Sequence, residues 1–113
     1  MDTRVIKKYP NRRLYDTVLS RYITLEDVRD LISDHVDIRV LEQRSGRDIT
    51  RGVMLQVVTE QEQEQGEAEV PRLSEQFLAQ LICTYRTAEA AETFRQLEEC
   101  MGRFAQQSAL KGH

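Results

Sequence analysis

The stretch that decides the fold of the N-terminal part is residues 7–17, which read KKYPNRRLYDT. It continues a segment, residues 4–9, in which polar and apolar side chains alternate as they do in a strand. Pro10 and Asn11 interrupt this alternation, because proline lacks the amide donor of a central strand and asparagine stabilises turns. We therefore expect residues 12–16 to return as a second strand, with the cations gathered around one turn.

The same stretch has the chemistry of a nucleic-acid contact. Its lysines and arginines can neutralise backbone phosphates, and its tyrosines can hydrogen-bond phosphate or stack on a base. A solvated hairpin explains the same composition without any ligand, so that alternative stays open. Adjacent residues of a regular strand point to opposite faces, so Arg12 and Arg13 reach one groove only if a bulge or turn intervenes.

Outward from this stretch, residues 24–34 predict a helix. Thr24 can cap its free amides, and Glu26 and Asp27 suit the first turn, where the helix dipole favours negative charge. Its apolar side chains, at helical spacing, are Leu25, Val28, Leu31 and Ile32. We expect this helix to be scaffold packed on the strands, because its acidic residues would repel phosphate in a DNA groove.

A strand and a second helix are expected next. Residues 36–43 alternate, with Val36, Ile38 and Val40 directed inward, and Ser45 and Gly46 supply a turn. Thr50 would then cap a helix over residues 51–63. That helix has apolar side chains at Val53, Met54, Val57 and Val58. Its β-branched residues leave a strand open as the alternative, but the Gln/Glu-rich continuation favours a helix.

The C-terminal third predicts a separate helical arm. Residues 60–69 are too polar to bury themselves, and a helix can start near Pro71. Apolar residues then recur at spacings of three and four, as in an interhelical seam, until the phase slips between Ala88 and Phe94. This slip fits a stutter, a local break near residues 86–87, or a turn between two antiparallel helices.

We expect one helix or a helical hairpin that serves oligomerisation, although the stripe could instead cover the N-terminal domain of the same chain. The fold class expected is α+β: a small head of short strands and two helices, followed by the helical arm. The domains would be a DNA-binding head over residues 1–60, a polar linker over 61–72 and an oligomerisation arm over 73–113. The residues expected for oligomerisation are Phe77, Leu78, Leu81, Ile82, Tyr85, Phe94, Leu97, Met101 and Phe104.

Charge is distributed unevenly along the 113 residues, which carry 16 basic and 19 acidic side chains and a net charge of -3. Residues 1–24 hold six basic and two acidic residues, whereas residues 53–113 hold five basic and ten acidic ones. This asymmetry favours a basic contact surface on an acidic body. No apolar run reaches the roughly 20 residues of a membrane span, and the N-terminus lacks the apolar segment of a signal peptide, so we expect a cytoplasmic protein.

Catalytic and metal chemistry find little support. The two histidines, His35 and His113, have no zinc spacing to either cysteine, and no nucleophile motif or phosphate-cradling glycine loop is present. We expect no enzyme activity, no metal site and no cofactor, with His35 facing solvent. Cys83 and Cys100 would lie about 25 Å apart on one straight helix, so we expect two buried thiols, with an intermolecular disulfide as the alternative.

Four segments resemble one family, the polyhydroxyalkanoate accumulation regulators. They are residues 7–17, then 22–28 (YITLEDV) and 46–51 (GRDITR), which resemble the family's N-terminal DNA-binding domain, and residues 73–82 (LSEQFLAQLI), which resemble the start of its central region. The likeness covers about the first sixty residues and fades beyond Tyr85. Residues 18–21 (VLSR) and the arm after Tyr85 depart from the family pattern, so promoter identity and polymer specificity do not carry over.

The resemblance implies a bacterial repressor that binds promoters of polyester-storage genes and is released by the polymer, for which the apolar residues of the arm expected to serve oligomerisation would be the binding surface. The oligomer expected from the arm is a dimer or tetramer. Its expected partner is double-stranded DNA, and no association with a membrane is expected. The residues expected to contact DNA are Lys7, Lys8, Tyr9, Asn11, Arg12, Arg13, Tyr15 and Arg21. The alternative from another class is an adaptor or granule-associated protein whose acidic helices bind a partner and whose basic turn binds an anion such as a nucleotide.

Overall fold

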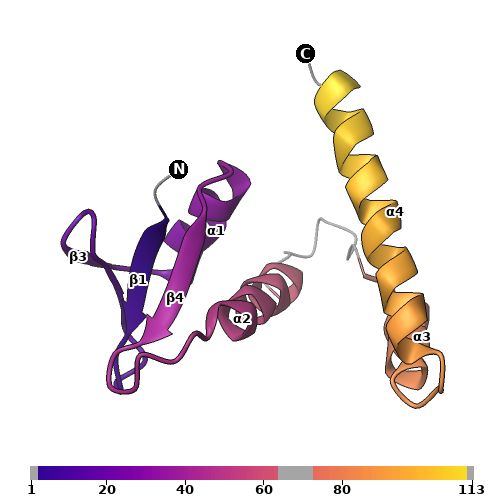
Figure 1. Ribbon diagram of the computed structural model, residues 1–113, viewed down its shortest axis with the longest axis horizontal. Coiled ribbons are helices and arrows are strands. Elements are labelled where there is room, and N and C mark those ends of the chain that lie inside the picture. The colour runs from indigo at the N-terminus through magenta and orange to yellow at the C-terminus, as the bar shows by residue number, and fades with distance from the viewer. Residues whose placement is uncertain (1–2, 64–72, 112–113) are drawn as a thin grey trace. The chain divides into compact units, whose positions relative to one another are not determined.

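The computed structural model describes residues 3–63 and 73–111 and divides into two compact units, Met1–Val70 and Pro71–His113 (Figure 1). We call the first the N-terminal unit and the described part of the second, residues 73–111, the arm. The elements are β1 (Arg4–Lys8), β2 (Leu14–Asp16), β3 (Arg21–Ile23), α1 (Leu25–Ser33), β4 (Ile38–Glu42), α2 (Thr50–Gln63), α3 (Glu75–Thr84) and α4 (Ala90–Lys111). The α+β class is confirmed: a mixed sheet with two helices precedes two C-terminal helices.

The sheet has the strand order β3-β2-β1-β4. Antiparallel pairs join β1 to β2 and β2 to β3, whereas β1 and β4 run parallel, with Ile6 opposite Val40. The parallel pair requires a crossover, which α1 provides. The strands expected around residues 4–9, 12–16 and 36–43 are therefore present with shorter bounds, and β3 is a further strand that the sequence did not predict.

One face of the sheet carries the hydrophobic core. Its buried members are Ile6, Leu14, Ile23, Val28, Ile38, Val40, Val53 and Val57. Since Val28 comes from α1, and Val53 and Val57 from α2, both helices pack on this inner face. The alternate residues of the strands form the outer face, which neither helix of the unit covers. Its members are Val5, Lys7, Tyr15, Tyr22, Arg39 and Leu41.

The first helix begins as its sequence predicts. The Thr24 side chain accepts a hydrogen bond from the Asp27 amide at 3.2 Å, and the Asp27 carboxylate accepts one from the Thr24 amide at 2.9 Å. This reciprocal capping box satisfies two donors at the start of α1. After the helix, His35 has a φ of 62° and is exposed, as expected.

The second helix begins differently from the prediction, because Thr50 is its first residue and not its cap. The Asp48 carboxylate accepts hydrogen bonds from the Thr50 amide at 2.9 Å and from its hydroxyl at 2.6 Å. The same hydroxyl accepts the Val40 amide at 2.9 Å. Thr50 therefore ties α2 to β4. Only Val53 and Val57 of the four expected apolar positions are buried, because Met54 and Val58 face away from the sheet.

The arm contains two helices and not one continuous helix. Ser74 caps α3 by accepting the Phe77 amide at 3.0 Å, and the chain turns between Thr84 and Ala90. The Tyr85 and Phe94 rings meet across this turn at 4.9 Å between centroids. The phase slip in the sequence thus marks the boundary between α3 and α4. Of the expected linker, residues 61–63 continue α2 and residues 64–72 lie outside the described part of the chain.

No side chain between residues 73 and 106 is buried. The expectation of buried thiols is therefore wrong, since both Cys83 and Cys100 are exposed free cysteines. Both cysteines lie on helices, as expected, but no residue from 73 to 106 is buried, so these helices leave the thiols in solvent.

Candidate nucleic-acid interface

The hairpin between β1 and β2 is closed by its backbone. The Tyr9 amide donates to the Arg13 carbonyl at 2.9 Å, and the Arg12 amide donates to the Tyr9 carbonyl at 2.9 Å. The Asn11 side chain accepts the Arg13 amide at 3.1 Å, so Asn11 shapes the turn. Pro10 to Arg12 therefore form a three-residue loop, built as a turn followed by a left-handed residue.

That left-handed residue is Arg12, with a φ of 70°. Glycine is the usual choice at this position, since a side chain there costs about 1–2 kcal/mol. Strain of this kind is typical of functional sites, where the side chain is needed. The tip of the hairpin therefore carries a cationic side chain at a position where the backbone conformation favours glycine.

Three tyrosines gather beside this hairpin. The ring centroids of Tyr9 and Tyr15 lie 6.3 Å apart, those of Tyr9 and Tyr22 6.1 Å, and those of Tyr15 and Tyr22 5.4 Å, all edge to face. Such geometry is favourable because the positive edge of one ring meets the negative face of another. Tyr15 and Tyr22 lie directly opposite in the β2–β3 register, with Lys7 opposite Tyr15 on β1. We call Tyr9, Tyr15 and Tyr22 the tyrosine cluster.

An arginine covers the exposed end of this cluster. The guanidinium carbon of Arg13 lies 3.8 Å from the centroid of the Tyr22 ring, a cation–π contact. Tyr22 remains 45% exposed. The sequence analysis left Tyr22 out of the contact residues, although the motif that carries the family resemblance contains it. Its place beside Tyr15 follows from the β2–β3 register, and three residues are too few for the period of a strand to show it in the sequence.

A buried ion pair fixes the strand that presents Tyr22. Asp16, which is fully buried, accepts a 2.6 Å hydrogen bond from Arg4 and also the amides of Val18 at 2.9 Å and Leu19 at 3.3 Å. Burial acts to raise the pKa of the Asp16 carboxyl, but the hydrogen bonds from Arg4 and the two amides outweigh it and hold the pKa below its usual value. Asp16 thereby anchors both the sheet and the β2–β3 turn.

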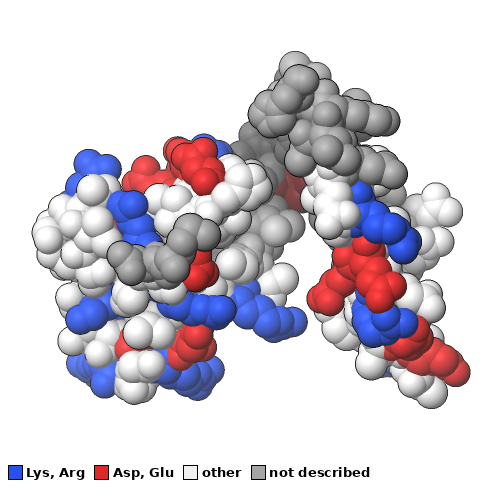
Figure 2. Space-filling model, turned by 45° about the horizontal axis from the view of Figure 1, so that its top comes forward, with Lys and Arg blue, Asp and Glu red and all other residues white. Residues whose placement is uncertain are grey.

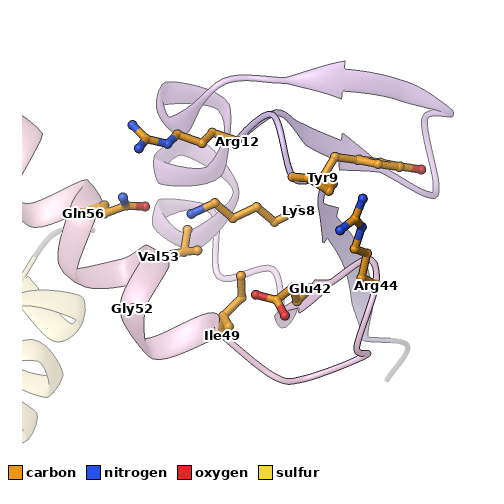
Figure 3. Close-up of a pocket in the computed structure, with 10 residues that line it drawn as sticks. Lys8, Tyr9, Arg12, Glu42, Arg44, Ile49, Gly52, Val53 and Gln56 are labelled. Carbon is orange, nitrogen blue, oxygen red and sulfur yellow. The ribbon is translucent and has the colours of Figure 1, made fainter.

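The structure separates the expected contact residues into two groups. Lys7, Tyr9, Arg13 and Tyr15 lie on or beside the outer face. Lys8 and Arg12, together with Tyr9, line a cavity of about 540 Å³ between the hairpin and α2 (Figure 3). Arg12 and Arg13 also border a smaller hollow of about 330 Å³ beside β3. Arg21 is exposed at the sheet edge, opposite Asp16.

A second group of cations surrounds the β4–α2 connection, and the sequence analysis missed it. It comprises Arg39, Arg44, Arg47 and Arg51, all exposed. Arg39 pairs with Asp48 at 3.4 Å, and the pKa of Asp48 is held below its usual value, chiefly by hydrogen bonds from Thr50. Acidic residues lie near these arginines in the sequence, so the net charge of this segment did not indicate a basic surface. The fold brings the arginines together. Figure 2 shows Lys and Arg side chains at several places on the visible face of the N-terminal unit.

The arm places its expected residues along two helices. Leu81 and Phe94 are half-buried. The others are exposed: Phe77, Leu78, Ile82, Tyr85, Leu97, Met101 and Phe104. Within residues 3–63 and 73–111, no helix is both long and apolar enough to span a membrane, and no three His, Cys, Asp or Glu side chains gather as a metal site would require.

Comparison with known proteins gives one family match and two relatives. The family described as the PHB/PHA accumulation regulator DNA-binding domain matches residues 5–65. An uncharacterized protein of Allochromatium vinosum is 46% identical over 104 residues, covering 92% of this chain and 65% of its own length. An uncharacterized protein in the phbA 5' region of Thiocystis violacea is also 46% identical over 104 residues, covering 72% of its own length. No solved structure matches.

Proposed function

Because the chain belongs to the PHB/PHA accumulation regulator DNA-binding domain family, which is regulatory and not catalytic, we propose that it represses polyhydroxyalkanoate storage genes by binding their promoters. The observation that carries the proposal is the outer face, where the tyrosine cluster and Arg13 lie uncovered by either helix of the unit. The location of the Thiocystis relative in the phbA 5' region supports storage genes as the target.

The contact surface in this proposal is the β1–β2 hairpin with the outer face beside it. The major groove of DNA admits a two-stranded ribbon, and a hairpin is such a ribbon. Arg12 and Arg13 at its tip would reach phosphates or base edges, and Lys7 would follow the backbone. The tyrosine cluster stiffens the hairpin, so less side-chain freedom is lost on binding. The full set proposed is Lys7, Lys8, Tyr9, Asn11, Arg12, Arg13, Tyr15, Arg21 and now Tyr22.

We further propose that the arm joins copies of this chain into a dimer or tetramer. Its apolar side chains have no cover within the arm: Ile82 is 69% exposed and Met101 70%. A second copy would bury them. Joining two DNA-binding units makes the second contact intramolecular, which raises the overall affinity without new contacts, and a symmetric dimer suits paired half-sites.

Release by the polyester would use the same apolar face of the arm in this proposal. If polymer and partner copy share that face, they compete for it. Added polymer should then lower the oligomer mass as it releases DNA, and both can be followed by sedimentation. Release of DNA with an unchanged mass would exclude the shared face and leave a separate polymer site.

The test of repression is fluorescence anisotropy with storage-gene promoter DNA and scrambled DNA over a salt series. The logarithm of affinity should fall with the logarithm of salt by about 0.9 per phosphate contact. Arg13→Gln should weaken promoter binding about tenfold, the loss expected for one charge-assisted contact. Arg29→Gln is the matched control, because it removes the same charge from α1 on the other side of the sheet.

A reporter gene under the same promoter then separates repression from binding alone. Expression should rise when Arg13→Gln replaces the wild type and stay low with Arg29→Gln. Equal weak binding to both DNAs, or none, would overturn the repressor and favour the adaptor, in which the basic hairpin binds an anion and the acidic helices bind a protein.

A further inference from the structure

The cavity between the hairpin and α2 combines residues of the proposed DNA contact with others, from the β4–α2 connection and α2, that this contact does not use. Its volume of about 540 Å³ lies within the range of about 300–1,000 Å³ typical of small-molecule sites. It is lined by Lys8, Tyr9, Pro10, Arg12, Glu42, Arg44, Ile49, Gly52, Val53 and Gln56. The structure assigns this cavity as a binding site for a small organic anion, a phosphate ester or phosphonate-like group joined to a compact apolar body.

Three cations from different segments line the cavity, with Lys8 and Arg12 extending toward Gln56 of α2 and Arg44 lying beside Tyr9 in the view of Figure 3. Lys8 comes from the end of β1, Arg12 from the hairpin tip and Arg44 from the β4–α2 connection (Figure 3). In the part of the chain that the structure describes, none of the three forms an ion pair. The one carboxylate in the lining, Glu42, accepts the Ser45 hydroxyl at 2.6 Å. The cavity therefore has an excess of uncompensated positive charge, which an anion would neutralise.

The floor of the cavity is apolar and lies at the start of a helix. Ile49 and Val53 form this floor, and Gly52, in the first turn of α2, adds no side chain to it. No acidic residue lies within that first turn, and the Asp48 carboxylate just before it, which is not part of the lining, accepts the Thr50 amide at 2.9 Å. An anion with an apolar body can thus place its charge against the cations and its body on the floor.

The walls of the cavity are held in place by backbone contacts. The Gln43 amide donates to the Lys8 carbonyl at 2.8 Å, which fixes the β4–α2 connection to the end of β1. Thr50 ties the start of α2 to Val40 of β4 at 2.9 Å. These contacts fix the backbone of Lys8, the β4–α2 connection and the start of α2 relative to one another, so the cavity is largely formed without a ligand, as is usual for small-molecule sites.

Occupancy of this cavity would compete with DNA, and this part of the inference rests on the proposed function. Lys8 and Arg12 belong both to the cavity and to the proposed DNA contacts. An anion bound between them neutralises the charges that would face phosphate. Because binding effects are reciprocal, DNA would lower the affinity for the anion by the same factor.

Gly52 offers a variant that fills the cavity without touching its charge. A Cβ placed there meets no atom within 4 Å, and the residue lies in a helix, where other residues are better formers than glycine. Gly52→Leu should therefore fold normally and occupy the space above Ile49 and Val53. Arg44→Gln removes one cation of the cavity, and Arg47→Gln is its control, with the same charge change in the same connection but outside the lining.

The first experiment titrates phenyl phosphate into the full chain and follows the amides of Gly52 and Gln56 by two-dimensional NMR. Saturable shifts are expected with the wild type and Arg47→Gln, about tenfold weaker binding with Arg44→Gln, and none with Gly52→Leu. Phenol and inorganic phosphate alone should bind more weakly than the ester. Absence of saturable shifts, or equal shifts in Gly52→Leu, would overturn the cavity as an anion site, whether or not the chain binds DNA.

The second experiment adds phenyl phosphate to the promoter complex at constant ionic strength. DNA affinity should fall for the wild type and stay constant for Gly52→Leu, whose cations are intact. Anion binding without any change in DNA affinity would overturn the competition. A chain that binds the anion but no promoter DNA would overturn the repressor proposal instead, so the two failures are distinct.

Discussion

The N-terminal unit and the arm use apolar side chains in opposite ways. In the N-terminal unit eight hydrophobic residues are buried between one sheet face and two helices. Between residues 73 and 106 not one side chain is buried, although apolar residues recur at helical spacing throughout. The first pattern is a domain core, and the second is an apolar face that no residue of the arm buries. The contrast teaches that periodicity identifies an apolar face but does not say whether the same chain covers it.

The largest expected effect tests the association of copies that we propose for the arm. In Ile82→Glu/Phe104→Glu, two exposed apolar residues are replaced by charges, which should weaken association about a thousandfold, or about 4 kcal/mol. Sedimentation velocity would show the loss of mass. The control Gln76→Glu/Gln96→Glu adds the same charges to α3 and α4 away from the stripe. If both variants keep the wild-type mass, the arm does not join copies of this chain.

The second largest expected effect concerns the hydrophobic core of the N-terminal unit. Ile6 is completely buried, and Ile6→Ala should lower the free energy of unfolding by about 3 kcal/mol, through lost burial and the cavity left behind. Urea unfolding followed by circular dichroism measures this. Met101→Ala, at a 70% exposed position, should change the unfolding of the N-terminal unit by no more than about 0.5 kcal/mol. Equal losses in the two variants would contradict the division between core and interface.

The third expected effect compares how much ion pairs contribute to stability in the N-terminal unit and in the arm. Asp16→Asn should cost about 2 kcal/mol at neutral pH, because it leaves Arg4 without its partner in a site where the Asp16 side chain is 1% exposed. Since folding lowers the pKa of Asp16, the wild type should lose this stability as the pH falls below about 4, and the variant should show a flatter acid profile.

The arm supplies the control for that profile. Arg95 pairs with Glu92 and Glu99, but all three side chains are more than half exposed, so solvent screens the pairs. Glu92→Gln should therefore leave the acid unfolding profile of the N-terminal unit unchanged. An acid profile of Asp16→Asn as steep as that of the wild type would show that other carboxylates control the transition.

The smallest effect concerns the strained hairpin. Arg12→Gly removes the strain of a side chain at a φ of 70° but gives the unfolded chain more freedom, so a net gain of about 0.5 kcal/mol is expected. Arg13→Gly, one residue later, should destabilise, because it removes the contact over Tyr22. Thermal unfolding distinguishes the two signs. A loss of stability in Arg12→Gly would mean that the Arg12 side chain supports the fold itself.

The sequence predicted the local parts of this fold well. The capping box of Thr24 and Asp27, the turn at Pro10 and Asn11, and the inward alternation of β4 depend on residues a few positions apart, and all are present. The parallel pairing of β1 with β4 joins segments more than thirty residues apart, so no local pattern specified it. Strand β3 has only three residues, too few for a period to show.

The site was predicted less completely, for a related reason. Lys7, Tyr9, Arg13 and Tyr15 could be found because they are neighbours in sequence. Arg44 joins Lys8 and Arg12 only through the pairing of β4 with β1, and Tyr22 joins the tyrosine cluster only through strand register. The sequence indicated that Thr50 caps α2, but its hydroxyl accepts the amide of Val40 in β4. Composition records which residues are present, whereas their convergence depends on tertiary structure.

The chain segment that follows β4 also prevents the edge of the sheet from pairing with a strand of another molecule. An unpaired edge strand is a template for aggregation, and joining copies through an arm would raise the local concentration of such edges. Here the backbone groups of Val40 and Glu42 that point away from β1 are bonded by residues 46–50, at 2.8–2.9 Å. At the opposite edge, β3 is too short to template a partner. Copies held close together can therefore remain separate folded bodies, each free to engage its own half-site.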